Sequence, residues 1–300
     1  MLSVGQAVLI GGVLILVDLG ARSLRLIALL KAVGADLRTA GACIATAFGD
    51  AASVLTPFRV GGTPARLAVL HRYRVPLSLG LGALALELLT YQAIVGLVGV
   101  FLATQVAPTL PGPGAFWSLP SAVLAVAAAA VLGAILIAFP WLRARFRRST
   151  AQLRRLPRRL KQDPNFWKGI AASLPLAVIS VIARLSLLPL LALSLPPNLR
   201  PPELSALAFA VTFGQILVPT PAGAGAVEYA FAATGVAATP GMTSIFVAWR
   251  ALTVGVVVSL GLALAVLACG KGILAAAFPP LRASRRRRTM ARRSDRPGSV

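Results

Sequence analysis

The sequence predicts an all-α, polytopic membrane protein with about five full spans and two broken or re-entrant helical hairpins arranged as an inverted repeat. Three observations predict this fold class. The 300 residues are 57% hydrophobic and only 13% charged, whereas about a quarter of a soluble domain is charged. Apolar runs of roughly 20 residues recur, the length that a helix needs to cross a bilayer. Two similar segments, one in each half, interrupt this pattern with proline and glycine.

Five apolar runs are long enough to be full spans. Only helices and closed barrels satisfy their backbone hydrogen bonds in lipid, and these runs lack the alternation of barrel strands. The first run is expected to end at Leu19, and a basic amphipathic stretch with Arg22 and Arg25 follows it. The expected spans are residues 2–19, 77–103, 121–141, 166–195 and 242–269.

The charge distribution predicts an orientation. The net charge of +22 would suggest nucleic acid in a soluble protein, but here the basic residues gather in loops and a tail, as the positive-inside rule expects. The loop at 143–161 and the tail at 276–300 are therefore expected in the cytoplasm, where they meet anionic lipid headgroups. The weakly charged loops at 104–118 and 196–203, and the N-terminus, are expected outside a bacterial-type plasma membrane. No nucleic-acid partner is expected.

Each half contains short apolar pieces that do not fit as full spans. The run 39–55 lies between two basic segments, so both of its flanks are expected inside. The pieces 204–217 and 222–236 lie between two loops that are expected outside. A hairpin that dips into the membrane and returns on the same side resolves both conflicts, provided that protein or water covers its irregular backbone.

The two short regions share a motif. The first contains Thr56, Pro57, Gly61, Gly62 and then Arg66; the second contains Pro219, Thr220, Pro221, Gly223, Gly225 and then Glu228. A long span with one opposite charge follows each motif, Glu87 in the first half and Arg250 in the second. This pattern predicts an inverted repeat, as in many transporters, with halves of about 1–105 and 164–270 in a membrane domain of 1–275.

The prolines predict where the backbone breaks. Proline lacks an N–H and clashes within a helix, and it pushes the preceding residue toward extended geometry. A new helix can then begin near Gly225, with its N-terminal amides free for an anion such as phosphate. The alternative is a plain kink of the kind that proline produces in long helices.

Four charged residues are candidates for a polar groove within the membrane. A charge at that depth costs several kcal/mol and needs a partner, so Glu228 is expected to pair with Arg250 or Arg66, and Glu87 with the remaining arginine. Asp50 and its counterpart Gln215 are candidates for the same groove, although Asp50 could instead cap a helix. The alternative interpretation is structural: ion pairs that only hold helices together.

No catalytic constellation is recognisable. The sequence contains one histidine, no phosphate-binding loop and no motif of serine hydrolases or zinc peptidases. We therefore expect no catalytic residues, metal or cofactor. A membrane-embedded lipid-modifying transferase remains an alternative, with Glu87 or Glu228 as its proton-transfer group, and so does a non-transporting membrane partner protein.

The segments "LTPFRVGGTPARLAVLHRYRVPLSLG" and "VPTPAGAGAVEYAF" resemble the two signatures of the lysylphosphatidylglycerol synthase transmembrane family, also described as flippase-like. Ala222 stands where this family usually has glycine, and the soluble aminoacyl-transfer domain of the full-length synthases is not seen. The resemblance implies a module that binds or translocates a phospholipid or an isoprenoid- or hopanoid-type lipid, with a separate synthase as a candidate partner. It carries over directly to Pro221, Gly223, Gly225 and Glu228, and more loosely to Gly62 and Arg66.

Overall fold

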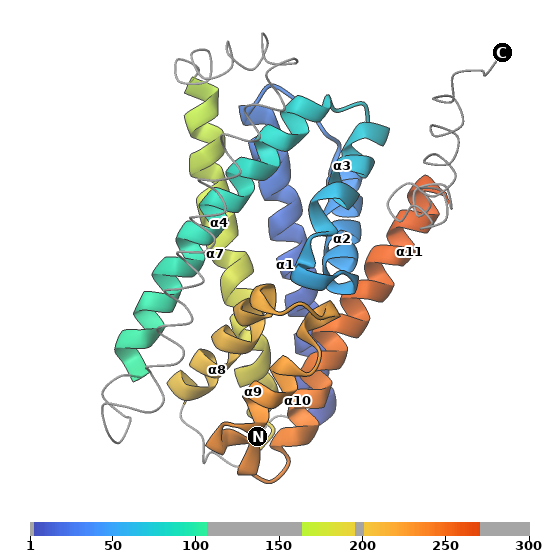
Figure 1. The fold of residues 1–300 in the computed structure, drawn as a ribbon. Coiled ribbons are helices and arrows are strands. Elements are labelled where there is room, and N and C mark those ends of the chain that lie inside the picture. The colour runs from blue at the N-terminus through green and yellow to red at the C-terminus, as the bar shows by residue number, and fades with distance from the viewer. Residues whose placement is uncertain (1–2, 107–163, 196–200, 271–300) are drawn as a thin grey trace, which may run out of the picture.

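The computed structural model describes residues 3–106, 164–195 and 201–270, and within these ranges all regular structure is helical (Figure 1). Four helices are long and apolar enough to cross a membrane: Gly5–Ala32, Leu77–Leu102, Pro164–Ala192 and Met242–Ala268. They confirm a helical membrane protein and coincide with four of the five expected spans. The fifth expected span at 121–141, the loop at 143–161 and the tail at 276–300 lie outside the described residues.

The first helix is longer than the sequence analysis predicted. Helix α1 runs without interruption through Val4–Ala32, and Ser3 and Gln6 cap its start reciprocally. The expected end at Leu19 is therefore wrong, and so is the separate amphipathic stretch. Arg22 and Arg25 lie within the helix, where their charge is neutralised by partners on other helices and does not end the span.

The two halves contain the same series of elements. The first half comprises α1, α2 (Thr39–Leu55), the short turn η1 (Pro57–Arg59), α3 (Gly62–Arg72) and α4 (Leu77–Val106). The second comprises α7 (Pro164–Ala192), α8 (Pro201–Phe213), η3 (Gly214–Leu217), η4 (Pro221–Gly223), α9 (Ala226–Ala232), η5 (Gly235–Ala238), α10 (Met242–Arg250), the π-helical segment η6 (Ala251–Val256) and α11 (Val257–Cys269). Helix α8 begins at Pro201, so the expected end of the loop 196–203 is wrong, and residues 196–200 lie outside the described residues.

The two short hairpins enter the bundle from opposite ends. In Figure 1, α2 and α3 occupy the upper part of the molecule, whereas α8 and α9 occupy the lower part. Each hairpin leaves at the end where it entered, and the turns η1 and η4 contact one another in the middle. This arrangement is the one expected of a re-entrant, inverted repeat.

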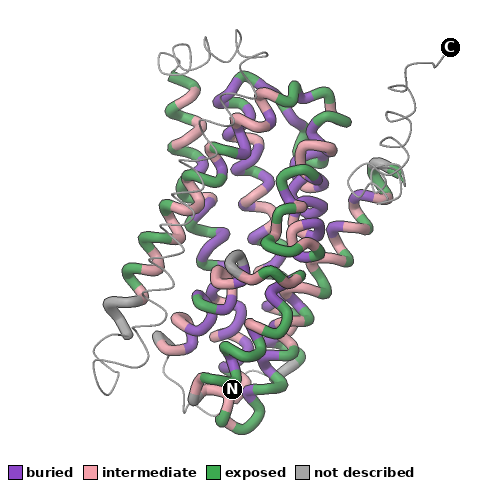
Figure 2. The backbone as a smooth tube through the Cα atoms, viewed as in Figure 1, coloured by how far each residue is buried: buried purple, intermediate pink, exposed green. Residues whose placement is uncertain are grey.

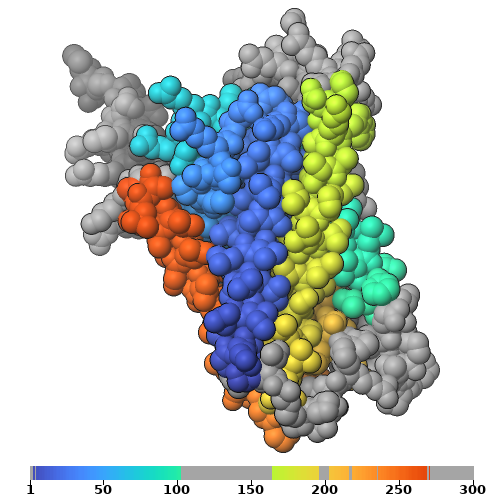
Figure 3. Space-filling view, turned by 180° about the vertical axis from the view of Figure 1, so that it is seen from behind, coloured from blue at the N-terminus to red at the C-terminus, as the bar shows by residue number. Residues whose placement is uncertain are grey.

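The long helices hold the two halves together. Helices α1 and α7 lie side by side along their length (Figure 3), and each half also packs its last helix against the hairpin of the other half, α4 against α8 and α11 against α2. Buried residues follow the inner faces of the bundle (Figure 2). The outer face of α4 exposes apolar side chains, including Leu97, Val100 and Phe101, as expected for contact with lipid.

The two breaks begin with similar backbone torsion angles, over Thr56–Arg59 and Thr220–Gly223. Thr56 and Thr220 are extended, with φ of −111° and −101°. The second residue after each threonine is left-handed although it is not glycine, with φ of 51° at Phe58 and 56° at Ala222. The next residue repeats this conformation, with φ of 56° at Arg59 and 67° at Gly223. A plain proline kink would not produce two consecutive left-handed residues, so each break is a built turn.

This geometry predicts that Ala222→Gly stabilises the protein. A left-handed alanine costs roughly 1–2 kcal/mol, which glycine avoids, although glycine loses about 0.5–1 kcal/mol through its greater freedom in the unfolded chain. The midpoint temperature of unfolding in detergent should stay level or rise. The control is Ala230→Gly in the helical part of α9, which should lower it; an equal drop in both variants would contradict the turn.

Candidate functional site

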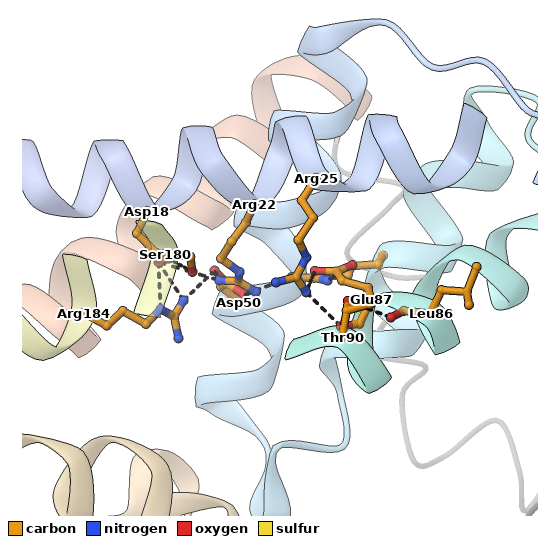
Figure 4. Close-up of polar contacts among 10 residues, drawn as sticks. Asp18, Arg22, Arg25, Asp50, Leu86, Glu87, Thr90, Ser180 and Arg184 are labelled. Atoms are coloured by element: carbon orange, nitrogen blue, oxygen red, sulfur yellow. Dashed lines mark hydrogen bonds and ion pairs between the residues drawn. The ribbon is translucent and has the colours of Figure 1, made fainter. Parts of the chain in front are cut away.

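A cluster of charged side chains lies in the middle of the bundle, where the two breaks meet. Five helices contribute to it, and Figure 4 shows most of its side chains. Charges at this depth in an apolar bundle are stable only with partners. This charged cluster consists of Asp18, Arg22 and Arg25 on α1, Asp50 on α2, Arg66 on α3, Glu87 on α4 and Arg184 on α7.

Glu87 is the acidic centre of one side of the cluster. Its carboxylate lies 2.9 Å from Nη1 of Arg66 and 3.2 Å from Nη2 of Arg25. Arg25 also donates to the Glu87 backbone carbonyl at 2.9 Å, and its guanidinium lies 5.1 Å from the ring centre of Tyr91. Of the two pairings left open by the sequence, Glu87 with Arg66 is the one found. The Arg66 side chain is mostly buried in the protein, with 11% of it exposed.

Asp50 connects the two sides of the cluster. It accepts hydrogen bonds from Arg22 and lies 3.4 Å from Arg66 and 3.6 Å from Arg184. Its position in the interior of α2 excludes the alternative role as a helix cap. Asp50 is therefore a shared counter-ion for arginines that come from three different helices.

Asp18 completes the other side of the cluster. It lies 2.8 Å from Arg184 and accepts a hydrogen bond from the Ser180 hydroxyl. Asp18 and Arg184 belong to α1 and α7, so this pair joins the first helices of the two halves. Arg184 thus has a counter-ion within the bundle and does not need to extend toward the membrane surface.

A glycine makes room for the approach of α3 to α2. A side-chain carbon at Gly49 would overlap the Arg66 side chain. Because position 49 carries no side chain, Arg66 can pass α2 and reach Asp50, the next residue along the chain. The sequence pair Gly49-Asp50 therefore supplies both the space and the counter-ion for Arg66.

The second half contains an isolated ion pair beside its break. Glu228 lies 2.7 Å from Arg250, as predicted, and Arg250 also donates to the Ala222 carbonyl at 3.0 Å. The other carboxylate oxygen of Glu228 accepts a hydrogen bond from the Gly225 N–H at 2.7 Å. The prediction that the amides near Gly225 serve an external anion is therefore not supported, because Glu228 itself caps the start of α9. An apolar groove of about 420 Å³ adjoins this pair.

The two halves thus hold equivalent ion pairs with exchanged charges. In the first half the base lies on the short helix after the break and the acid on the long helix that follows; in the second half these positions are reversed. Their surroundings differ, since the Glu228 side chain is 46% exposed and that of Glu87 only 6%.

A small cavity of about 50 Å³ lies beside the charged cluster, and we call it the central cavity. Asp50 and Gln215 both line it, as predicted for the two counterparts. Gln215 is buried, and its amide donates to the Val211 carbonyl. The other polar residues that line the central cavity are Asp18, Arg59, Arg184, Thr212, Trp249 and Thr253. Its volume suits a few water molecules or one small polar group.

Sequence reasoning found Asp50, Gln215 and both ion pairs, but it did not include several residues of the site. Arg22 and Arg25 were assigned to a stretch beyond the first span, although their spacing from Asp18 places them near one face of a continuous helix. Arg59 lay among other basic residues, and no pattern marked Thr212 or Trp249. Within the described residues, no group of three histidine, cysteine, aspartate or glutamate side chains could hold a metal ion.

The fold and the site define a class: helical membrane proteins with two re-entrant hairpins around a buried charged centre. The chain matches the family model described as "Lysylphosphatidylglycerol synthase TM region" over residues 3–261, and it belongs to this family. No curated protein and no solved structure matched the chain in comparison. Family membership connects the protein with membrane lipids.

The difference in burial predicts different coupling energies for the two ion pairs. We compare two double-mutant cycles, one with Arg66→Gln and Glu87→Gln and the other with Arg250→Gln and Glu228→Gln. The coupling free energy of the exposed pair, Glu228 and Arg250, should be about 0.2–1 kcal/mol. The buried pair should couple more strongly. Removing one of its members takes a partner from a desolvated charge and should lower the free energy of unfolding by up to about 3–5 kcal/mol, with Arg25 still beside Glu87 and Asp50 still beside Arg66. Stability in detergent is the measurement, and equal coupling in the two cycles would contradict the assigned burial.

Proposed function

We propose that this protein transports a membrane lipid by passing its charged headgroup through the centre of the bundle. One observation carries the proposal: the charged cluster and the central cavity lie where two built backbone turns meet, near the middle of helices long enough to span the membrane. Lipid tails stay in the bilayer during such a movement, so only the headgroup needs a polar path.

The paired breaks support a transport role. Discontinuous helices that meet near the bilayer midplane commonly form substrate sites in transporters, and rocking of one repeat against the other opens them alternately. Here the last helix of each half packs on the hairpin of the other, so a movement of either half changes the surroundings of both turns. The apolar groove beside Glu228 and Arg250 offers a surface for the lipid tail.

We propose transport in preference to a lipid-modifying reaction. A proton-transfer group works best when its pKa lies near the operating pH, and close arginines favour the ionised form of a carboxylate. Glu87 lies between Arg66 and Arg25, and Glu228 is held by Arg250 and the Gly225 N–H. Both candidate groups are therefore engaged in holding the fold.

Reconstitution into liposomes tests transport. A fluorescent phospholipid should move between leaflets at least tenfold more slowly with Arg184→Gln than with the parent protein, because this variant removes a guanidinium from the central cavity. Arg72→Gln, which changes the same charge at an exposed end of α3, should leave the rate unchanged. Equal rates for a folded Arg184→Gln and the parent would overturn the proposal.

We also propose that the N-terminus faces the outside of a plasma membrane and that the C-terminus faces the cytoplasm. This orientation follows from the basic residues at the end of the bundle where α3 and α4 meet. Single cysteines at exposed Asp36 and Ala238, in a background lacking Cys43 and Cys269, test this. An impermeant thiol reagent should label Ala238→Cys in intact cells and Asp36→Cys only after permeabilisation. The reverse pattern would invert the orientation.

A further inference from the structure

The charged cluster and the central cavity together hold an excess of positive charge. Arg59 lines this cavity with Arg184, Asp18 and Asp50. Counting Arg59 with the cluster, five arginines face three carboxylates: Arg22, Arg25, Arg59, Arg66 and Arg184 against Asp18, Asp50 and Glu87. Unbalanced charge within an apolar bundle is unfavourable. The cavity is therefore electrostatically suited to an anion.

Arg59 is the arginine that remains available. Arg22, Arg25, Arg66 and Arg184 each have a carboxylate partner. Arg59 has no ion pair within the part of the chain that the structure describes. It is partly buried, and its neighbours across the central cavity are themselves already paired.

The backbone of Arg59 is strained. Its φ of 56° is left-handed, and the equivalent position in the other half is occupied by Gly223, with φ of 67°. Glycine adopts this conformation without cost, whereas an arginine does not. Non-glycine residues held in such conformations cluster at ligand sites. A large basic side chain at a position suited to glycine therefore points to a function for that side chain.

Two more polar groups of this cavity lack a hydrogen-bond partner within the described structure. They are the indole N–H of Trp249, which is fully buried, and the hydroxyl of Thr212. Buried polar groups are nearly always hydrogen-bonded, so each exception needs an explanation. The N–H can only donate and the hydroxyl can do so, which together with the Arg59 guanidinium makes the cavity rich in donors.

We propose that the central cavity binds a phosphate-type anion, with Arg59 supplying the charge and Trp249 and Thr212 supplying hydrogen bonds. This inference rests on the proposed function, for which it names the chemical class of the bound group. A phosphate group presents several acceptor oxygens and a negative charge, which matches a cavity lined by three residues with available donors. At about 50 Å³, the cavity admits such a group but not a whole lipid.

Arg66 and Arg250, the arginines of the two ion pairs beside the breaks, are less available to an anion than Arg59. Arg66 is occupied by Glu87 and Asp50, and Arg250 by Glu228 and the Ala222 carbonyl. An anion would have to displace these partners, whereas Arg59 has none to displace.

Thermal unfolding of the full-length protein in maltoside micelles, which contain no phosphate, tests the proposal. Ligands that bind the folded state raise the midpoint temperature, and the rise grows with the logarithm of ligand concentration above Kd. The probes are inorganic phosphate, dihexanoyl phosphatidic acid and, as the phosphate-free control, dihexanoylglycerol. A rise of this form with either phosphate probe, and none with dihexanoylglycerol, is expected. A response to inorganic phosphate identifies the free anion as sufficient, and a response to the lipid alone identifies a headgroup site; both support the proposal.

Arg59→Gly is the decisive variant. Because glycine relieves the left-handed strain, it should not lower the midpoint temperature without ligand, yet it should weaken binding of the phosphate probe at least tenfold. Trp249→Phe, which keeps a ring but removes the N–H, should weaken binding several-fold, and the exposed Arg72→Gln should not change it. No rise in midpoint temperature with either phosphate probe, an equal response to dihexanoylglycerol, or unchanged binding by Arg59→Gly would overturn the proposal.

This experiment separates the inference from the proposed function. If the protein binds phosphate through Arg59 but moves no lipid in liposomes, the anion site is supported and the transport proposal is rejected. If Arg59→Gly moves lipid at the normal rate and binding does not depend on Arg59, the transport proposal stands and the anion site is rejected.

Discussion

The need to neutralise charge within an apolar bundle is the constraint on which the rest of the structure depends. An uncompensated charge at membrane depth is costly, so each buried acid of the charged cluster is shared between helices. Asp50 faces arginines from α1, α3 and α7, and Glu87 faces arginines from α1 and α3. These contacts fix the positions of α1, α2, α3, α4 and α7 relative to one another. Apolar packing alone would not specify that arrangement, because lipid competes for the same surfaces.

The two halves are alike in backbone and unlike in charge. Their turns begin with similar torsion angles, over Thr56–Arg59 and Thr220–Gly223. The first half carries most of the buried ionic groups, whereas the second half contributes Arg184 and the more exposed pair of Glu228 and Arg250. Such asymmetry is expected if a single site lies between two halves with similar backbones. The inverted repeat requires two matching turns, whereas one cavity requires only one set of polar side chains.

The sequence predicted the two backbone turns and their ion pairs better than it predicted the charged cluster. Proline and glycine act locally, so Thr56-Pro57 and Thr220-Pro221 marked both turns, and the exchanged signs of Arg66, Glu87, Glu228 and Arg250 marked both pairs. The charged cluster could not be predicted, because it joins residues that are distant in the chain, such as Asp18 and Arg184, which are 166 positions apart. The first span was predicted too short for a related reason: Arg22 was treated as a boundary when its partner, Asp50, lies on another helix.

The arginines of the centre differ in what they can do, although they are alike in sequence. Those with carboxylate partners hold helices together, and removing one takes a charged contact away from a shared acid. Arg59 holds no helix by an ion pair within the described residues, and it occupies a backbone position that glycine fills in the other half. Stability alone would favour glycine at both positions. The strained arginine is therefore best explained by a group that is bound during function. Arg59 lies in the turn η1, which contacts η4, so a movement of either half would alter the surroundings of that group.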